Sequence, residues 1–412
     1  MKKEPQNLKT AIESLRNATQ EFHRHIEVLP LLEAQDRILA ETICAKISLP
    51  RFDNSAMDGY ALKVANAGKK LKIQSKIFAG DCAEVDLGDL ECAKIMTGAK
   101  VPNGADCVVP FEEIEGGFEN TEQILAPQNL KKGANIRKCG EEVARDSVLL
   151  EKGATLSADS LTLLATQGIS YVKVFAPLKI NVFASGDELK EIWEQADSYQ
   201  IYNSNSTMIQ AILKSYGFGS HYGGILSDNQ NVIKRALESP SDVIFTSGGA
   251  SKGEADFIRE VLEQSGAQMV LSGVQIKPGK PIMVAKLDSK FIVALPGNPL
   301  AGAVLLRLLI VPFLRQLSGA SAHYPQFLLF KSAHNLPRKS RTEAVLAKIR
   351  GDCVSFVKGG KYGSSEVMPM ALGNALVVFD VSRDSIVEGE ILKVLPFQME
   401  FGAEEADFIN GL

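Results

Sequence analysis

The strongest constraint on the fold lies between residues 177 and 320, where apolar segments of strand length alternate with amphipathic segments of helical spacing. The strand-like segments are KINVFASG, HYGGIL, DVIFTSGG and FIVALPG. Such alternation predicts a parallel or mixed sheet covered by helices on both faces, which is a three-layer α/β domain. Because ligands bind beyond the carboxyl ends of the strands in such sheets, we expect functional residues in the loops that follow them.

The segments on both sides of this pattern predict further domains, so the expected fold class is a multidomain α/β plus β protein. A capping box of Thr10 and Glu13 predicts a helix near the N-terminus, and a second helix is predicted to begin near Pro30. Short alternating runs between turn residues predict a β-rich insertion, and short strands after residue 323 predict a small β-barrel. The predicted domains are an N-terminal helix packing on the α/β domain (1–22), a discontinuous linking domain (23–46 and 141–176), the β-rich inserted domain (47–140), the α/β domain (177–322) and a C-terminal β-barrel domain (323–412).

The charge balance limits the partners that the chain could bind. The net charge is -4 and the pI is near 5.9, so an extended surface for nucleic acid is not expected, and any anion site must be local. The six cysteines form no C-x-x-C pair, and the N-terminal segment lacks the apolar core of a signal peptide. We therefore expect reduced thiols and a cytoplasmic location.

The most apolar stretch runs from Phe291 to Leu314, but Pro296, Pro299 and Arg307 interrupt it. A membrane span needs about 20 uninterrupted apolar residues. We therefore predict a strand, a turn and a buried helix here, and no membrane partner.

Two motifs follow predicted strands and could bind an anion. In SGGASKGEAD, Gly248 and Gly249 would let backbone amides approach a ligand, although a turn with a helix cap explains the glycines equally well. In IKPGKP, Lys277 and Lys280 would place two ammonium groups against a phosphate or another oxyanion, and the alternative is a solvated turn.

Two more motifs follow predicted strands. In ALPGNPLAG, Asn298 is expected as the N-cap of a helix. The free N–H groups of that helix would face the ligand, or the motif is simple capping without a ligand. In SGDEL, Glu188 could join Asp228 and Asp256 in holding Mg²⁺ through carboxylates. As isolated acids these residues would be surface groups or helix caps, so it is their convergence on one sheet edge that favours a site.

Seven motifs occur together in the order found in one known family. They are DNSAMDGYA (53–61), KIMTGAKVPNGADCVV (94–109), SGDEL, IYNSNS (201–206), SGGASKGEAD, KPGKP and LPGNP. In these motifs the chain resembles the molybdopterin molybdenumtransferases, which include the E domain of gephyrin. The resemblance implies an elongated four-domain fold and a homodimer with the active cleft between subunits. It also implies a reaction in which molybdate is inserted into adenylated molybdopterin, with Mg²⁺ as cofactor and AMP as product.

The resemblance also implies the roles of individual residues. Asp58, Thr97, Glu188 and Asp228 would be catalytic, and Glu188, Asp228 and Asp256 would hold the metal. The expected partners, besides the two substrates, are a molybdopterin adenylyltransferase and molybdoenzyme chaperones. The residues expected to bind substrate are Ser247, Gly248, Gly249, Ser251, Asp256, Lys277, Lys280, Pro296, Gly297, Asn298 and Glu142.

The chain departs from the family pattern at four places. Glu142 stands where an aspartate is common, and a carboxylate displaced by about 1 Å matters in a preorganised site. Lys252 and Ala294 replace a small apolar residue and a glycine, and the C-terminal domain shows no clear counterpart of a frequent arginine.

Two other functions compete with this interpretation. A molybdopterin adenylyltransferase would share the α/β domain, but it would not share DNSAMDGYA or IMTGAK, which lie outside residues 177–320. A gephyrin-like scaffold without catalytic activity would bind a partner peptide. The intact acidic and lysine motifs favour the enzyme over the scaffold.

Overall fold

The computed structural model describes residues 4–81, 84–227, 229–248, 257–337, 341–383 and 385–397, and the backbone of 401–403 and 409–410. These residues form two compact units. The chain passes between the two units four times, once within helix α2 (Ala158–Thr166), and Gly168 follows this helix with a φ of +67°. The larger unit comprises Met1–Glu41, Lys152–Leu161 and Ser170–Leu412, and the smaller unit comprises Thr42–Glu151 and Thr162–Ile169.

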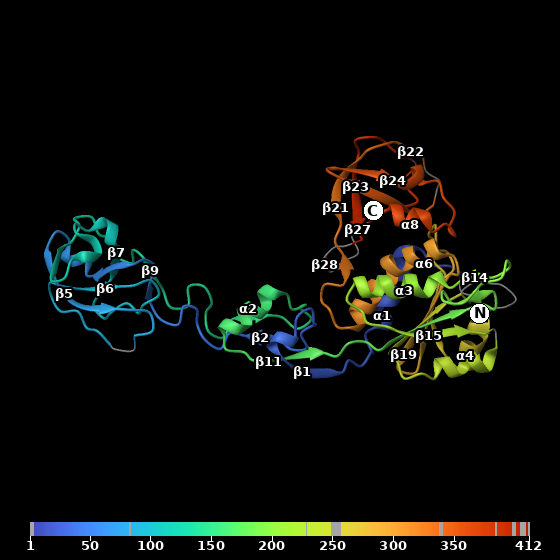
Figure 1. The fold of residues 1–412 in the computed structure, drawn as a ribbon, viewed down its shortest axis with the longest axis horizontal. Helices are drawn as coiled ribbons and strands as arrows, with labels where there is room; N and C mark the ends of the chain where they lie inside the picture. Colours follow the sequence, from blue (N-terminus) through green and yellow to red (C-terminus); the bar gives the residue numbers. More distant parts are fainter. Residues whose placement is uncertain are drawn as a thin grey trace. The chain divides into compact units, whose positions relative to one another are not determined.

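A six-stranded sheet forms the centre of the larger unit (Figure 1). Its first four strands run parallel, as the alternation of strands and helices predicts. Two further strands continue the sheet through antiparallel pairings and form an edge that the sequence pattern did not reveal. In sheet order the strands are β15 (His221–Leu226), β12 (Ile180–Ser185), β16 (Val243–Ser247), β19 (Lys290–Leu295), β18 (Met283–Leu287) and β17 (Gln268–Ser272).

Helices cover both faces of this sheet, so the predicted three layers are confirmed (Figure 1). Successive residues of a strand point to opposite faces. Val243 and Phe245 of β16 therefore share one core with α1, α3, α6 and α7, while Ile244 between them packs with α4 and α5. The helices are α1 (Leu8–Ala18), α3 (Ser204–Ser215), α4 (Gln230–Leu237), α5 (Phe257–Gln264), α6 (Pro299–Leu305) and α7 (Val311–Leu317).

The N-terminal helix begins earlier than the sequence suggests. Helix α1 starts at Leu8, and the side chain of Asn7 caps it by accepting a hydrogen bond from the Thr10 N–H over 2.8 Å. The predicted capping box of Thr10 and Glu13 is therefore wrong, because both residues already lie inside the helix. Leu8, Ala11 and Leu15 are buried in the core of the α/β domain.

The second predicted helix, near Pro30, is also wrong. Residues 26–30 form strand β1 (Ile26–Pro30), which pairs antiparallel with β11 (Tyr171–Phe175), and only a single 3-10 turn, η1 (Leu31–Glu33), follows. The helical path ends because Asp36 adopts a φ of +61°, and the Asp36 N–H donates to the Leu156 carbonyl oxygen.

The long apolar helix is a core element. Residues Pro299–Leu317 run through α6, a π-helical turn η5 (Leu306–Ile310) and α7. This segment of 19 residues is long and apolar enough to cross a membrane, but 89% of it is buried within the protein. Such burial is typical of the central helix of a globular domain, as the sequence analysis expected.

The C-terminal part of the larger unit is a closed β-barrel, which confirms the predicted fold class. Five strands pair in the order β23–β24–β21–β27–β25, and β25 pairs back with β23 to close the barrel. One face of β23 contributes Val345 and Ala347 to the barrel core, while Ala344 and Leu346 belong to the core of the α/β domain. The strands are β21 (Leu328–Ser332), β23 (Glu343–Arg350), β24 (Cys353–Phe356), β25 (Ala375–Phe379) and β27 (Ile391–Pro396), and β29 (Ile409–Asn410) pairs with β25.

Shorter elements complete the larger unit. A 3-10 segment, η6, and helix α8 follow β24 in the chain. Three pairs of two-residue or three-residue strands connect loops of the α/β domain or of the barrel. The bounds are η6 (Val357–Gly360), α8 (Met368–Leu372), β13 (Leu189–Lys190) with β14 (Ile201–Tyr202), β20 (Tyr324–Pro325) with β28 (Phe401–Ala403), and β22 (Leu336–Pro337) with β26 (Ser385–Ile386).

The smaller unit is β-rich. A five-stranded sheet, with hydrophobic side chains buried on both faces, forms its core. In sheet order the strands are β7 (Cys107–Pro110), β4 (Gly59–Leu62), β6 (Glu91–Ile95), β5 (Lys70–Ile77) and β8 (Gln123–Leu125). The other elements are β2 (Ile43–Cys44) with β10 (Val148–Leu150), β3 (Asn54–Ser55) with β9 (Ile136–Arg137), and the 3-10 turns η2 (Val64–Asn66), η3 (Phe111–Glu113) and η4 (Gly117–Glu119).

Candidate functional site

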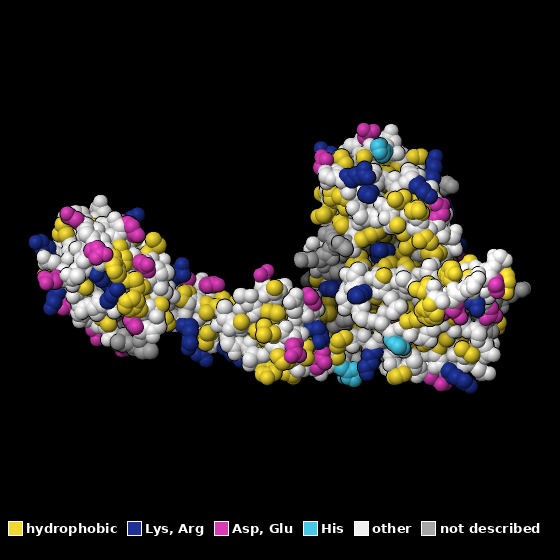
Figure 2. All heavy atoms as spheres, in the orientation of Figure 1, with side chains coloured by type: hydrophobic (Ala, Val, Ile, Leu, Met, Phe, Trp, Pro, Cys, Tyr) yellow, Lys and Arg dark blue, Asp and Glu magenta, His cyan; other side chains and the backbone are white. Residues whose placement is uncertain are grey.

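A cleft with a volume of about 1300 Å³ lies between the α/β domain and the barrel. Figure 2 shows the surface hollowed there, with basic side chains facing the hollow. Among the described residues that line it, five are basic and two are acidic, so the cleft attracts anions although the chain carries a net negative charge. The basic residues are Lys9, Lys277, Lys280, Arg341 and Lys361, and the acidic residues are Glu343 and Asp380.

The loop that carries Lys277 and Lys280 is held rigidly on the α/β domain. The Val274 N–H donates to the Lys280 carbonyl oxygen over 3.0 Å, which closes the loop on itself. Gly279 lies against helix α6 with a φ of +117°, and a Cβ atom at this position would be 2.8 Å from Leu305 Cγ. Only glycine combines that backbone conformation with so close an approach.

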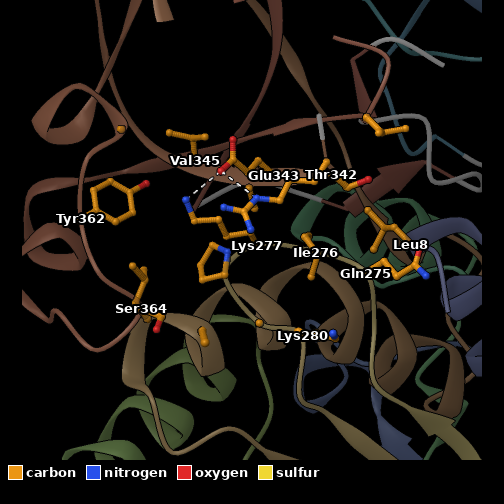
Figure 3. A pocket seen from close by; sticks show the side chains of 18 of the residues that line it. Leu8, Gln275, Ile276, Lys277, Lys280, Thr342, Glu343, Val345, Tyr362 and Ser364 are labelled. Atoms are coloured by element: carbon orange, nitrogen blue, oxygen red, sulfur yellow. Dashed lines mark ion pairs between the residues drawn. The ribbon is translucent and has the colours of Figure 1, made fainter. Parts of the chain in front are cut away.

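Lys277 also joins the α/β domain to the barrel. Its backbone N–H donates to the Thr342 carbonyl oxygen over 3.1 Å, and its carbonyl oxygen accepts from the Ala344 N–H over 2.8 Å. Its ammonium lies 3.1 Å from Oε1 of Glu343, and the same carboxylate oxygen is 3.8 Å from Nε of Arg341 (Figure 3). The cleft thus brings a lysine predicted from the sequence together with two charged residues that were not predicted.

The missed residues belong to the C-terminal domain. Arg341 supplies a guanidinium to the cleft from the C-terminal domain, in which the motifs alone show no clear counterpart of the family's frequent arginine. Tyr362 and Ser364 of the loop after η6 also line the cleft (Figure 3). These residues lie in short strands and turns, and the motif RTEAV contains no glycine, proline or repeated charge that would mark it as a site.

The strands β12, β16 and β19 end side by side at one edge of the sheet. Ser247 of β16 lies in register between Ala184 and Leu295, and the Gly248 N–H donates to the Leu295 carbonyl oxygen over 3.0 Å. Gly248 has a φ of +104°, and a Cβ atom here would lie 2.9 Å from the Ser185 carbonyl oxygen. The backbone conformation and this close approach both require glycine at position 248.

The LPGNP segment follows β19 at the same edge, and Pro296 and Asn298 line the cleft. Asn298 occupies the N-cap position of α6, but its side chain makes no capping hydrogen bond and instead donates to Ser364 Oγ over 2.9 Å. The predicted N-cap position of Asn298 is therefore confirmed, but its side chain does not cap the helix. Gly297 is exposed, and its carbonyl oxygen accepts from Asn205 Nδ2 over 2.8 Å.

The predicted acidic residues can be placed only in part. Glu188 is exposed just beyond the end of β12, and its carboxylate lies over Gly186, where a Cβ atom would be 2.6 Å from Glu188 Oε2. In the part of the chain that the structure describes, no group of three or more His, Cys, Asp or Glu side chains is arranged to hold a metal ion. Five of the predicted or discussed positions lie outside the described residues, namely Asp228, Gly249, Ser251, Lys252 and Asp256.

In the smaller unit the fold brings two predicted residues together. Oδ1 of Asp58 accepts hydrogen bonds from the Thr97 N–H over 2.6 Å and from the Thr97 hydroxyl over 2.8 Å. These hydrogen bonds lower the pKa of Asp58, with the backbone bond as the larger cause. Glu142 is exposed, and its backbone N–H donates to the Leu49 carbonyl oxygen over 3.0 Å.

The architecture and the cleft define a multidomain α/β protein with a basic cleft at the edge of its sheet. Two family descriptions match the sequence. Residues 6–168 match the MoeA N-terminal region (domain I and II), and residues 181–316 match a probable molybdopterin binding domain.

Similar proteins cover nearly the whole chain. A molybdopterin molybdenumtransferase of Haemophilus influenzae is 33% identical over 391 residues, which are 92% of this chain and 96% of that protein. One of Staphylococcus epidermidis is 30% identical, with 96% of each chain covered. The crystal structure of a molybdopterin biosynthesis moeA protein from Pyrococcus horikoshii superposes with a TM-score of 0.80 at 27% identity, covering 96% of this chain and 100% of that one.

The chain therefore belongs to the molybdopterin molybdenumtransferase family. The predicted family, the multidomain fold class and the predicted class of enzyme, a transferase of molybdenum-cofactor synthesis, are confirmed.

Proposed function

We propose that this protein inserts molybdate into adenylated molybdopterin and releases AMP. The observation that carries the proposal is the basic cleft, in which Lys277, Lys280 and Arg341 gather beside the carboxyl edge of the sheet. Molybdate and the phosphates of an adenylated pterin are both anions, and ammonium and guanidinium groups are strong hydrogen-bond donors to such oxygens. A cleft of about 1300 Å³ also has room for a ligand of nucleotide size or larger.

Residues at different positions would have different roles in this reaction. The cations would hold the phosphates and molybdate, and the glycine at the end of β16 would let the backbone approach the ligand. Ser247, Pro296 and Asn298 would line the path of the substrate along the sheet edge. Asp58, held by two hydrogen bonds from Thr97, would contribute a carboxylate.

Mg²⁺ is the cofactor that we propose for this site. Glu188 presents an exposed carboxylate at the carboxyl end of β12, and oxygen ligands of this kind suit Mg²⁺, which commonly takes only one or two carboxylates together with water and phosphate oxygens. Asp228 and Asp256 would complete the set, and both lie outside the described residues. When bound, the ion would neutralise phosphate charge.

We further propose that the protein acts as a homodimer in the cytoplasm. In that arrangement, which follows the family resemblance, Asp58 and Thr97 of one subunit would serve the cleft of the other. A molybdopterin adenylyltransferase would supply the adenylated pterin, and molybdoenzyme chaperones would receive the product.

The decisive experiment is to mix the purified protein with adenylated molybdopterin, molybdate and Mg²⁺ and to measure AMP. We expect release that needs both molybdate and the divalent cation, and that a chelator abolishes. Equal turnover in excess chelator would contradict the proposed role of Mg²⁺. Turnover of ATP with free molybdopterin, without any effect of molybdate, would instead indicate an adenylyltransferase.

A further inference from the structure

We propose that Glu343 is a positioning residue, which holds Lys277 and Arg341 side by side in the cleft and limits their combined positive charge. The inference rests on the proposed function, because it concerns the oxyanion-binding cations of that same cleft. It assigns a role to an acidic side chain in a site where a negative charge opposes the binding of anions.

The backbone fixes the distance between the partners. Lys277 forms an isolated parallel bridge with Glu343, through hydrogen bonds to the residues on either side of Glu343. The two side chains therefore start from neighbouring backbone positions, although they lie 66 positions apart in the sequence. An ion pair of 3.1 Å then fixes the end of the lysine side chain, which would otherwise sample many rotamers.

Burial distinguishes the carboxylate from the cations. The Glu343 side chain is 14% exposed, whereas those of Lys277 and Arg341 are 43% and 48% exposed. The carboxylate is thus largely buried in the cleft wall, whereas the ammonium and guanidinium groups are more open to solvent. One oxygen, Oε1, lies within ion-pair distance of both cations and so draws them toward the same point.

This arrangement has two opposed consequences for an oxyanion. Precise placement of the cations favours the geometry of the reaction, because small displacements in a preorganised site reduce turnover strongly. The carboxylate charge, however, repels the anion and weakens its binding. Loss of the Glu343 charge should therefore lower kcat without weakening the affinity for molybdate. If the ion pair served the fold alone, its loss would lower kcat, the affinity for molybdate and the stability together.

The test uses Glu343→Gln, which keeps the shape of the side chain, and Glu343→Asp, which keeps its charge. Glu390→Gln is the matched control, since Glu390 is also a partly buried glutamate of the barrel domain that pairs with an arginine, Arg383, and it does not line the cleft. For each full-length protein we would measure kcat and KM for AMP release, the Kd for molybdate alone by calorimetry, and the thermal midpoint.

We expect Glu343→Gln to lower kcat roughly tenfold or more, as loss of preorganisation does. The Kd for molybdate should be unchanged or about threefold tighter, as removal of a repulsive charge in a solvated cleft predicts. Glu343→Asp should recover part of kcat, and Glu390→Gln should match the wild type. In a Lys277→Met background, Glu343→Gln should lower kcat much less than it does in the wild type, because its effect acts partly through Lys277.

Two results would overturn the inference: an unchanged kcat in Glu343→Gln, or a kcat that falls together with weaker molybdate binding and a lower thermal midpoint. If Glu343→Gln does not fold, the same criteria apply to Glu343→Asp, whose kcat must fall while its Kd stays constant. If the wild type releases no AMP, the proposed function fails. The Kd for molybdate then tests Glu343 independently of that reaction. Weaker molybdate binding by Glu343→Gln would refute the positioning role, and equal or tighter binding would support it.

Discussion

Asp58 and Thr97 lie 39 residues apart in the sequence, yet two hydrogen bonds from Thr97 converge on one oxygen of Asp58. Each residue comes from a different motif of the smaller unit, and both side chains are on the surface of that unit. A carboxylate that accepts hydrogen bonds from both a backbone N–H and a hydroxyl is held in one orientation, and these bonds favour its ionised form. The pair therefore has the properties of a preorganised acidic group that needs no burial.

Asp58→Asn should separate this role from stability. Because Asp58 is exposed, the free energy of unfolding should change by no more than about 0.5 kcal/mol, as for most surface substitutions. AMP release should fall roughly 100-fold, the order expected for losing a preorganised electrostatic contact. Urea unfolding and steady-state kinetics measure the two effects. Asp89→Asn, which alters an exposed acid in the same unit, serves as the control. Near-normal turnover in Asp58→Asn would make the AMDG segment a structural turn only.

The pKa of Asp58 offers a second prediction. Its folded-state pKa is lowered by Thr97, so the contact stabilises the fold above the unfolded-state pKa and is lost as the pH falls through the folded-state value. Thr97→Ala removes the hydroxyl but keeps the stronger backbone hydrogen bond. We expect the pKa of Asp58 to rise only part of the way to its usual value, which an NMR titration of the carboxyl carbon would measure. A pKa that does not move would show that the hydroxyl contributes nothing.

The sequence predicted the parts of the site that carry strong local signals. Gly248, Lys277 and Lys280 stand in glycine-rich or proline-rich turns after strands, and the structure places them at the sheet edge or in the cleft. Arg341 and Glu343 could not be predicted in the same way. Their proximity to Lys277 depends on how the barrel packs against the α/β domain, a relation between distant segments that no local pattern encodes.

Gly279 should be required for the shape of the lysine loop. Gly279→Ala places a Cβ atom 2.8 Å from Leu305 in a conformation that L residues rarely adopt, so we expect a loss of roughly 1–3 kcal/mol in stability. Gly219→Ala is the matched control, because a Cβ atom there meets nothing within 4 Å. Urea unfolding of both variants would measure the difference. Equal stability of the two variants would mean that the loop moves away from α6 without cost.

The fold shows the same limit as the site. The four parallel strands were predictable because buried strands and amphipathic helices have different periodicities. The antiparallel edge strands β18 and β17 were not, because they are not separated by a helical segment. The predicted helix near Pro30 failed because the pairing of β1 with β11 takes precedence over a weak helical pattern.

Complementation between variants would test the proposed dimer. If Asp58 of one subunit serves the cleft of the other, mixed dimers of Asp58→Asn and Lys277→Met subunits contain one site with both substitutions and one intact site. Random pairing should then restore about one quarter of the wild-type sites, because about half of the dimers are mixed. Coexpression of the two variants, followed by measurement of AMP release, provides the test. If the activity is no higher than that of the separate variants, either Asp58 and Lys277 serve the same site within one subunit or the protein does not form dimers.

The two lysines of the cleft separate metal insertion from adenylation of the pterin. Lys277→Met or Lys280→Met keeps much of the side-chain volume but removes a charge-assisted contact of about 1.5 to 3 kcal/mol. We expect roughly tenfold to 150-fold weaker apparent affinity for molybdate or for the pterin phosphate. The loss should be larger for Lys277, because its removal leaves the Glu343 carboxylate with less compensation beside the anion. Lys214→Met, on helix α3 and outside the cleft, is the control and should behave as the wild type.

None of these proteins should turn over ATP with free molybdopterin. If the wild type does so, and Lys277→Met suppresses that reaction while molybdate leaves its rate unchanged, the cations serve an adenylyltransferase and the proposed reaction is wrong.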